Sequence, residues 1–181
     1  MTVNNRVGFG SDTVQLAIYV ANRPPIDVCP SLNALRPLGK GELHAIVAQT
    51  SNHWRKLFNV YAKFLFSLEW PLTQGLSCST WQNYRDDYLL QGVCGEALLF
   101  SCPDYHQPSV LHIIAGKTYA KGLALPFELH WLDEYFALNL QYRTLVCPYL
   151  DYRQLSDSRI ARLVDLSRPL LRTDIATSKS K

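Results

Sequence analysis

The stretch TVQLAIYVA, Thr13 to Ala21, sets the fold class of this chain. It is a continuous run rich in Val, Ile, Leu, Ala and Tyr, and it stops at NRPPID, where two prolines follow each other. Short apolar runs bounded by prolines are typical of strands buried on both faces, which occur mainly in parallel sheets covered by helices. We therefore predict that residues 13–21 form a buried strand of such a sheet.

The rest of the chain alternates between apolar runs and segments with helical spacing. Residues 42–68 have helical periodicity; one bent helix or two helices fit, and Thr50, Ser51 and Asn52 favour a break because they are good N-caps. We predict further helices over 79–92, 117–123 and 156–171, and strands over 96–103, 109–116 and 144–150. Residues 128–143 fit either a helix or a strand plus a helix. This alternation predicts an α/β fold, a three-layer sandwich with a central, mostly parallel sheet flanked by helices.

The length of 181 residues suits one domain. We expect a flexible N-terminal segment over 1–12, a single α/β domain over 13–172 and a disordered tail over 173–181. The loop from Asn22 to Gly41 contains four prolines, which exclude a continuous helix, and long loops of this kind are often functional.

Composition narrows the possible classes of protein. No apolar run approaches the roughly 18 to 20 residues that span a bilayer, and the first residues are polar, so we expect a cytoplasmic protein without a membrane partner. The net charge of +3 is too small to diagnose nucleic-acid binding. The five cysteines include no C-x-x-C pair, which favours reduced thiols.

The segment HIIAGKTYAKGL, His112 to Leu123, contains the letters Gly-Lys-Thr of a phosphate-binding loop. Such a loop needs a second glycine five positions earlier, and that position is Leu111. We therefore favour a simple turn from strand to helix. Anion binding near Lys117 and Lys121 is the alternative.

Other chemical motifs are missing from the sequence. The five histidines form no H-E-x-x-H motif and no zinc-ligand spacing with cysteine, and no G-x-S-x-G or G-x-G-x-x-G is present, so we predict no metal and no cofactor. We interpret His112 as a hydrogen-bonded core residue. Asp86 and Asp87, beside Arg85, look like a solvated helix face.

Polar residues gather after the first and last predicted strands. Ligands bind at the carboxyl ends of the strands in open α/β sheets, and aromatic, amide and guanidinium groups suit a planar base or a sugar. The alternative is a tyrosine-rich loop that packs over a helix. The predicted binding residues are Arg23, Lys117, Tyr149, Asp151, Tyr152, Arg153 and Gln154, and the candidate catalytic residues are Asn22 and Asp27.

Four segments resemble the uracil-DNA glycosylase superfamily, in particular its mismatch-specific uracil/thymine branch. They are VANRPP (20–25), SNHWRKL (51–57), HIIAGKTYAKGL (112–123) and CPYLDYRQ (147–154). The resemblance implies a glycosylase-like fold, a water-positioning role for Asn22 and a structural role for Trp54. The first loop lacks the glycines of that branch, and Cys147 to Leu150 replaces its His/Asn-Pro-Ser loop, so the resemblance implies catalytic motifs that are degraded.

Three functions remain open at this point. The first is a protein that binds DNA or a nucleotide in a cleft made basic by Arg23, Lys117, Arg153 and Arg159. The second is an active glycosylase with a non-standard site, in which Asn22 or Asp27 orients water. The third is a protein-interaction module that uses exposed aromatic residues, namely Tyr105, Trp131 and Tyr135.

Overall fold

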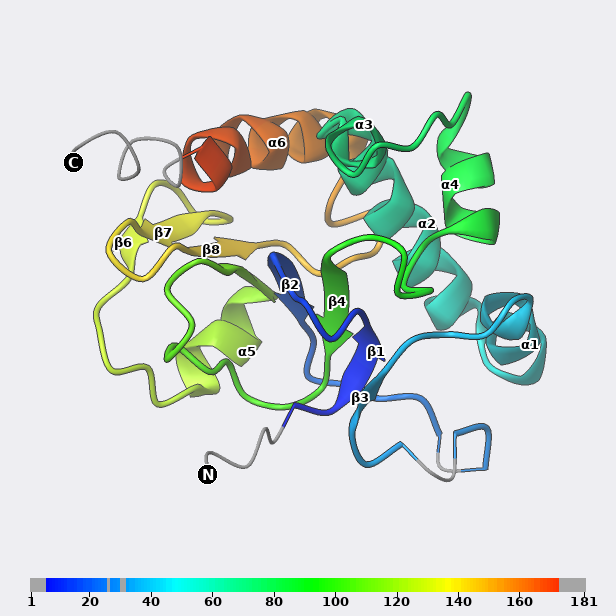
Figure 1. Cartoon of the computed structure of the whole chain (residues 1–181). Helices are drawn as coiled ribbons and strands as arrows, with labels where there is room; N and C mark the ends of the chain where they lie inside the picture. The colour runs from blue at the N-terminus through cyan, green and yellow to red at the C-terminus, as the bar shows by residue number, and fades with distance from the viewer. Residues whose placement is uncertain (1–5, 26, 30–31, 173–181) are drawn as a thin grey trace.

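A computed structural model describes residues 6–25, 27–29 and 32–172, which form an α/β fold around one mixed sheet of eight strands (Figure 1). The strands are β1 (Gly8–Gly10), β2 (Leu16–Tyr19), β3 (Leu35–Arg36), β4 (Glu96–Leu99), β5 (Leu111–Ala115), β6 (His130–Trp131), β7 (Ala137–Asn139) and β8 (Thr144–Cys147). The helices are α1 (Glu42–Gln49), α2 (Asn52–Ser67), α3 (Trp70–Thr73), α4 (Trp81–Asp87), α5 (Lys117–Gly122) and α6 (Asp157–Arg172).

The centre of the sheet is parallel and its flanks are mixed. The strand order is β3-β1-β4-β2-β5-β8-β7-β6, in which β4, β2, β5 and β8 run parallel. β1 is antiparallel to β4, and β7 is antiparallel to β8. Every residue of β2 is buried, so the predicted buried strand within residues 13–21 is confirmed.

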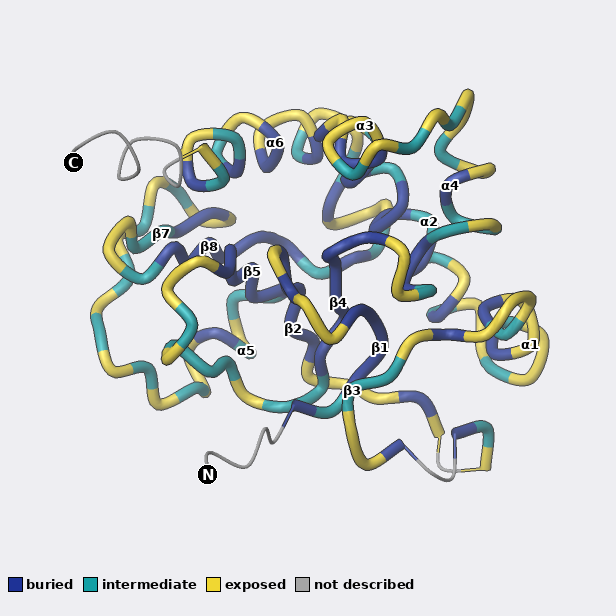
Figure 2. The backbone as a smooth tube through the Cα atoms, in the orientation of Figure 1, coloured by how far each residue is buried: buried dark blue, intermediate teal, exposed yellow. Residues whose placement is uncertain are grey.

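The two faces of the sheet are covered unequally. Leu16 and Ile18 of β2 belong to the large core beneath α1, α2, α3, α4 and α6, whereas Ala17 and Tyr19 point to smaller clusters on the other face. α5 packs on that second face, with Ala120 against Ile114 (Figure 1). Figure 2 shows the buried central strands between these two layers. The arrangement is a three-layer sandwich with one thick and one thin helical layer.

The predicted helix break is present. α1 ends at Gln49 and α2 begins at Asn52, with Ser51 as the N-cap residue in an extended conformation. α4 begins after Thr80, whose hydroxyl accepts the amide N–H of Asn83 at 3.1 Å. α4 ends at Asp87, earlier than the predicted boundary at residue 92. None of the helices in the described ranges is long and apolar enough to cross a membrane.

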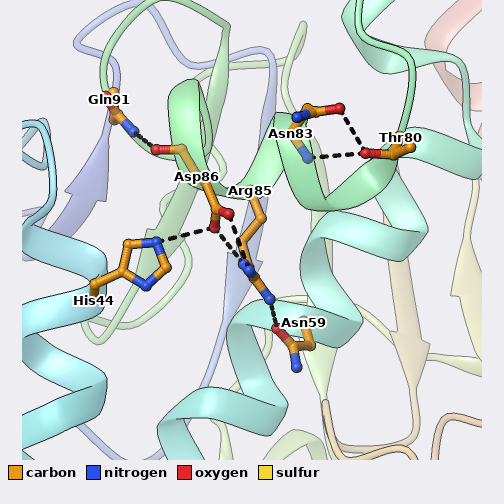
Figure 3. Close-up of polar contacts among 7 residues, drawn as sticks. All are labelled: His44, Asn59, Thr80, Asn83, Arg85, Asp86 and Gln91. Carbon is orange, nitrogen blue, oxygen red and sulfur yellow. Dashed lines mark hydrogen bonds and ion pairs between the residues drawn. The ribbon is translucent and has the colours of Figure 1, made fainter.

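A polar cluster joins three helices of the thick layer (Figure 3). The Asp86 carboxylate lies 2.6 Å from Arg85 Nε and 3.1 Å from Nε2 of His44 on α1. Arg85 Nη1 donates to Asn59 of α2 at 2.6 Å. The hydrogen bond from Arg85 holds the pKa of Asp86 below its usual value. The interpretation of this segment as a solvated face holds for Asp87, which is exposed, whereas Arg85 and Asp86 are only partly exposed because they contact α1 and α2.

The segment before residue 13 differs from the expectation of a flexible N-terminus. Residues 8–10 form β1, all of them buried, and Phe9 is fully inaccessible to solvent. Its two glycines concealed this strand, because they carry no apolar side chains that would show a pattern. Residues 1–5 and the predicted tail over 173–181 lie outside the described residues. The ambiguous segment 128–143 contains the antiparallel strands β6 and β7.

His112 lies on β5 and is 2% exposed. Its Nδ1 is 2.8 Å from the Tyr19 hydroxyl, and the two rings stack with centroids 5.7 Å apart. The prediction of a hydrogen-bonded core histidine is confirmed. Burial lowers the pKa of His112 to about 4, because a charged imidazolium is disfavoured away from water.

We expect this histidine to weaken the fold in acid. The unfolded chain takes up the proton near pH 6.5 and the folded chain only near pH 4, so the free energy of unfolding falls as the pH is lowered between these values, by about 3 kcal/mol. Urea titrations at neutral pH and near pH 4 would measure this loss of unfolding free energy in the wild type and in His112→Asn. An equal loss in both proteins would contradict the assignment to His112.

Candidate ligand-binding cleft

A cleft opens where the carboxyl ends of β2 and β5 separate. These strands are parallel neighbours, but the chain after β2 leads to α1–α4 in the thick layer, and the chain after β5 leads to α5 in the thin layer. Adjacent parallel strands whose following segments leave to opposite sides create a crevice at which open α/β sheets bind ligands. The cleft therefore occupies the place where this architecture favours a site.

The cleft has a volume of about 570 Å³, within the range of about 300 to 1,000 Å³ that is usual for small-molecule sites. Its apolar walls come mainly from Ala21, Ala115, Tyr119 and Leu123. Its polar residues come from three places in the chain and are Asn22, Lys117, Thr118, Tyr149 and Gln154. Such a mixture can hold a flat organic group and also orient it by hydrogen bonds.

Tyr149 links the cleft to the first turn of α2. Its ring stacks on His53 with centroids 5.3 Å apart, and its hydroxyl lies 2.8 Å from His53 Nε2. Burial raises the pKa of Tyr149 to about 12, and a side-chain hydrogen bond with Asn22 partly opposes that rise. The Tyr149 hydroxyl thus keeps its proton at neutral pH and can donate a hydrogen bond to the imidazole of His53.

His53 is suited to accept that hydrogen bond. Burial lowers the pKa of His53; Asp151 opposes this effect and Lys56 adds to it. A neutral imidazole presents one nitrogen as an acceptor. The contacts of Tyr149 with Asn22 and His53 therefore hold its ring in place as one wall of the cleft.

Asp151 supports the loop behind this wall. Its Oδ1 accepts the amide N–H of Arg153 at 2.9 Å, and its Oδ2 lies 3.1 Å from Lys56 Nζ. Both interactions lower the pKa of Asp151, and the hydrogen bond from the Arg153 amide has the largest effect. Lys56 also lies 4.9 Å from the centre of the Tyr152 ring. Asp151 orders the loop and is not among the residues that line the cleft.

The structure brings together some of the predicted residues and separates others. Asn22, Lys117, Tyr149 and Gln154 share the cleft. Tyr152 and Arg153 are exposed on the adjoining loop, with the guanidinium 5.8 Å from the Tyr152 ring.

The remaining predicted residues belong to the proline-rich loop. Arg23 donates to the backbone carbonyl of Leu32, and Asp27 is exposed; neither lines the cleft. The expected basic cleft therefore lacks Arg23, because its guanidinium closes the loop that follows β2.

Sequence reasoning missed His53 and Lys56. They stand three residues apart near the start of α2, a spacing that places both side chains on one face of the helix. Within the described part of the chain, no cluster of three or more His, Cys, Asp or Glu side chains could hold a metal ion.

Gly116 forms the strand-to-helix turn that the sequence predicted. Its φ is 108°, and its amide donates to the carbonyl of Cys147 at 2.8 Å, so this amide continues the sheet ladder. Lys117 Nζ donates to the backbone carbonyl of Glu134 at 3.1 Å. The Gly-Lys-Thr segment is thus built into the sheet and the neighbouring hairpin.

These features define a three-layer α/β protein with a ligand-sized cleft at the carboxyl ends of its parallel strands. The chain belongs to the DUF6942 family, a family of unknown function, whose model matches residues 7–168, from just before β1 into α6. No curated protein and no solved structure matches the chain. The resemblance to uracil-DNA glycosylases therefore stays a prediction.

Proposed function

We propose that the cleft binds a nucleobase, either that of a nucleotide or one within a nucleic acid. The observation that carries this proposal is the convergence of Asn22, Tyr149 and Gln154, from opposite ends of the chain, on one cleft of about 570 Å³. Side-chain amides can form paired hydrogen bonds with the edge of a base, and tyrosine rings can stack on its face. The cleft thus offers both kinds of recognition that a base requires.

The segments that resemble uracil-DNA glycosylases support the same ligand. Asn22 comes from the first of them, Gly116 from the third, and Tyr149 and Gln154 from the fourth, and all four residues line the cleft. The second segment contributes His53, which contacts Tyr149. Of the two candidate catalytic residues, Asn22 alone lines the cleft. Because the first loop lacks the glycines of the glycosylases and Cys147 to Leu150 replaces their His/Asn-Pro-Ser loop, binding without base removal is the function that we favour.

The interaction-module hypothesis receives less support. Tyr105 packs on Phe127, with ring centroids 4.8 Å apart, and Trp131 lies beneath two lysines. Tyr135 is 37% exposed, with the Arg159 guanidinium over its ring. Each of these three aromatic rings thus contacts another ring or a cation within the chain.

Removal of an amide from the cleft is expected to weaken base binding. We predict that Asn22→Ala and Gln154→Ala each weaken the binding of nucleosides by about tenfold, since a good paired contact with a base contributes about 1–3 kcal/mol. Isothermal titration with adenosine, uridine, cytidine, guanosine and thymidine would measure this. Gln82→Ala, an exposed residue of α4, is the control. Equal affinity in all variants, or no binding of any nucleoside, would overturn the proposal.

A further inference from the structure

Three cations flank the cleft, and each lies over an aromatic ring. Lys117 and Lys121 of α5 place their ammonium groups 4.9 Å and 5.9 Å from the centre of the Trp131 ring. The guanidinium carbon of Arg159, on α6, lies 3.7 Å from the centre of the Tyr135 ring. Trp131 ends β6, and Tyr135 lies in the connection between β6 and β7. We call these five residues the cation rim.

The cation rim is directly connected to the cleft. Lys117 lines it, and Arg159 Nη1 donates at 2.6 Å to the backbone carbonyl of Gln154, which also lines it. One cation thus comes from the helix after β5, and another comes from the helix after β8. A ligand seated in the cleft would have positive charge beside it on both helices.

Two carboxylates, those of Asp133 and Glu134, lie near the cation rim. Glu134 interacts with the Tyr135 side chain, and the charge of Arg159 also acts on Asp133. Asp133 lies 3.0 Å from Arg162 Nη2 and accepts the amide N–H groups of Tyr135 and Phe136. Within the described residues, no carboxylate forms an ion pair of 4.0 Å or less with Lys117, Lys121 or Arg159. Lys117 and Arg159 each donate one hydrogen bond to a backbone carbonyl, and their other N–H groups can donate to an anionic ligand.

We infer that the cation rim binds the phosphate groups of the ligand whose base occupies the cleft. This inference rests on the proposed function. Ammonium and guanidinium groups form charge-assisted hydrogen bonds with phosphate oxygens, and guanidinium can do so with two oxygens at once. The rings beneath the cations restrict their motion before binding, so less conformational entropy is lost when a phosphate arrives.

The test compares nucleosides with ligands that carry phosphate groups. The full chain would be titrated at low and high salt with adenosine, uridine, their monophosphates and triphosphates, thymidine monophosphate, a short oligothymidylate and inorganic tripolyphosphate. We expect each added charge to strengthen binding, with the triphosphates at least about tenfold tighter than the nucleosides, and this advantage to shrink in high salt. Tighter binding of the oligothymidylate than of thymidine monophosphate would identify a nucleic-acid strand as the ligand. Equal binding of the two would identify a free nucleotide.

Variants separate the cation rim from the base site. Lys121→Gln, at a residue of the rim that does not line the cleft, should remove part of the phosphate advantage and leave nucleoside affinity unchanged. Lys117→Gln and Arg159→Gln should lower the affinity for nucleotides by a larger factor than the affinity for nucleosides, whereas Asn22→Ala should weaken nucleosides and nucleotides alike. Lys40→Gln, an exposed lysine before α1, controls for the loss of one charge. Circular dichroism would verify that each variant is folded.

The outcomes distinguish the two proposals. If nucleosides bind but phosphates add nothing, or if the rim variants keep the full phosphate advantage, the cation rim inference is wrong and the base site stands. If tripolyphosphate binds in a Lys117-dependent manner and nucleosides do not, the base site is wrong and the rim is an anion site. If no probe binds, both are wrong.

Discussion

Replacement of Gly10 by alanine is expected to destabilise the protein by roughly 4 kcal/mol or more. A Cβ at this position would lie 2.4 Å from the carbonyl oxygen of Glu96 and 2.6 Å from the Cα of Ala97, both on β4. The φ of Gly10 is 140°, which non-glycine residues rarely adopt. β1 could relieve this clash only by leaving β4, and it would then expose Phe9, which is fully buried.

Urea denaturation of Gly10→Ala and Gly122→Ala would test this. A Cβ at Gly122, in the last turn of α5, meets no atom within 4 Å, so the control should change the free energy of unfolding by less than about 0.5 kcal/mol. If Gly10→Ala were as stable as Gly122→Ala, β1 would not be an integral strand, and the expectation of a flexible segment over residues 1–12 would apply after all.

Glu96 is the second position where we expect a large effect. This residue begins β4 and is fully buried. Its carboxylate accepts the indole N–H of Trp70 at 3.0 Å and the amide N–H of Leu90 at 2.9 Å. Trp70 and Leu90 lie on opposite sides of α4 in the sequence, so one carboxylate anchors both ends of the helical segment that precedes β4.

Glu96→Ala should lower the free energy of unfolding by about 3 kcal/mol, because it leaves two buried donors without an acceptor and also creates a cavity. Glu96→Gln should cost less, because its amide oxygen can still accept one of these hydrogen bonds. Chemical denaturation at neutral pH, with the exposed Glu128→Ala as the control, would measure both. A loss below about 1 kcal/mol in Glu96→Ala would contradict the anchoring role.

The pH dependence provides an independent check on Glu96. Burial raises its pKa above 4.5, so the folded chain holds a proton that the unfolded chain has already released. The corresponding stabilisation is present below pH 4.5 and is lost as the pH rises through the raised value. Glu96→Gln has no proton to release, so the difference in stability between wild type and variant should change over this interval. A constant difference would show that Glu96 does not titrate there.

The central elements could be predicted because each carries a local signal. β2, β4, β5 and β8 are short, fully buried strands within the apolar runs that the sequence displays. The break between α1 and α2 was visible from the capping residues at Thr50 and Ser51. β1 has no such signal, because Gly8 and Gly10 form a strand only by lying directly against the backbone of β4.

For the candidate site, the sequence predicted the edge of the sheet but not which residues share the cleft. The positions of Asn22 and Tyr149 after strands placed both at the carboxyl edge of a sheet. Whether they share a cleft depends on strand order: β5 lies between β2 and β8, so the ends of these strands are close in space. His53 entered the site through its contact with Tyr149, which no spacing within either segment predicts.

The amino-acid sequence thus specifies the central strands and the longer helices of this protein, the parallel character of its centre and the edge at which polar residues gather. These properties follow from hydrophobic periodicity, capping and proline placement, which act over a few neighbouring residues. Only the tertiary structure decides that β1 pairs with β4 and that Asn22, Tyr149 and Gln154 share one cleft. It also decides that Arg23 donates to Leu32 and that Asp86 contacts Arg85 and His44. Most of these features depend on contacts between distant segments, and such contacts exist only once the strand order and the packing of the helices are set.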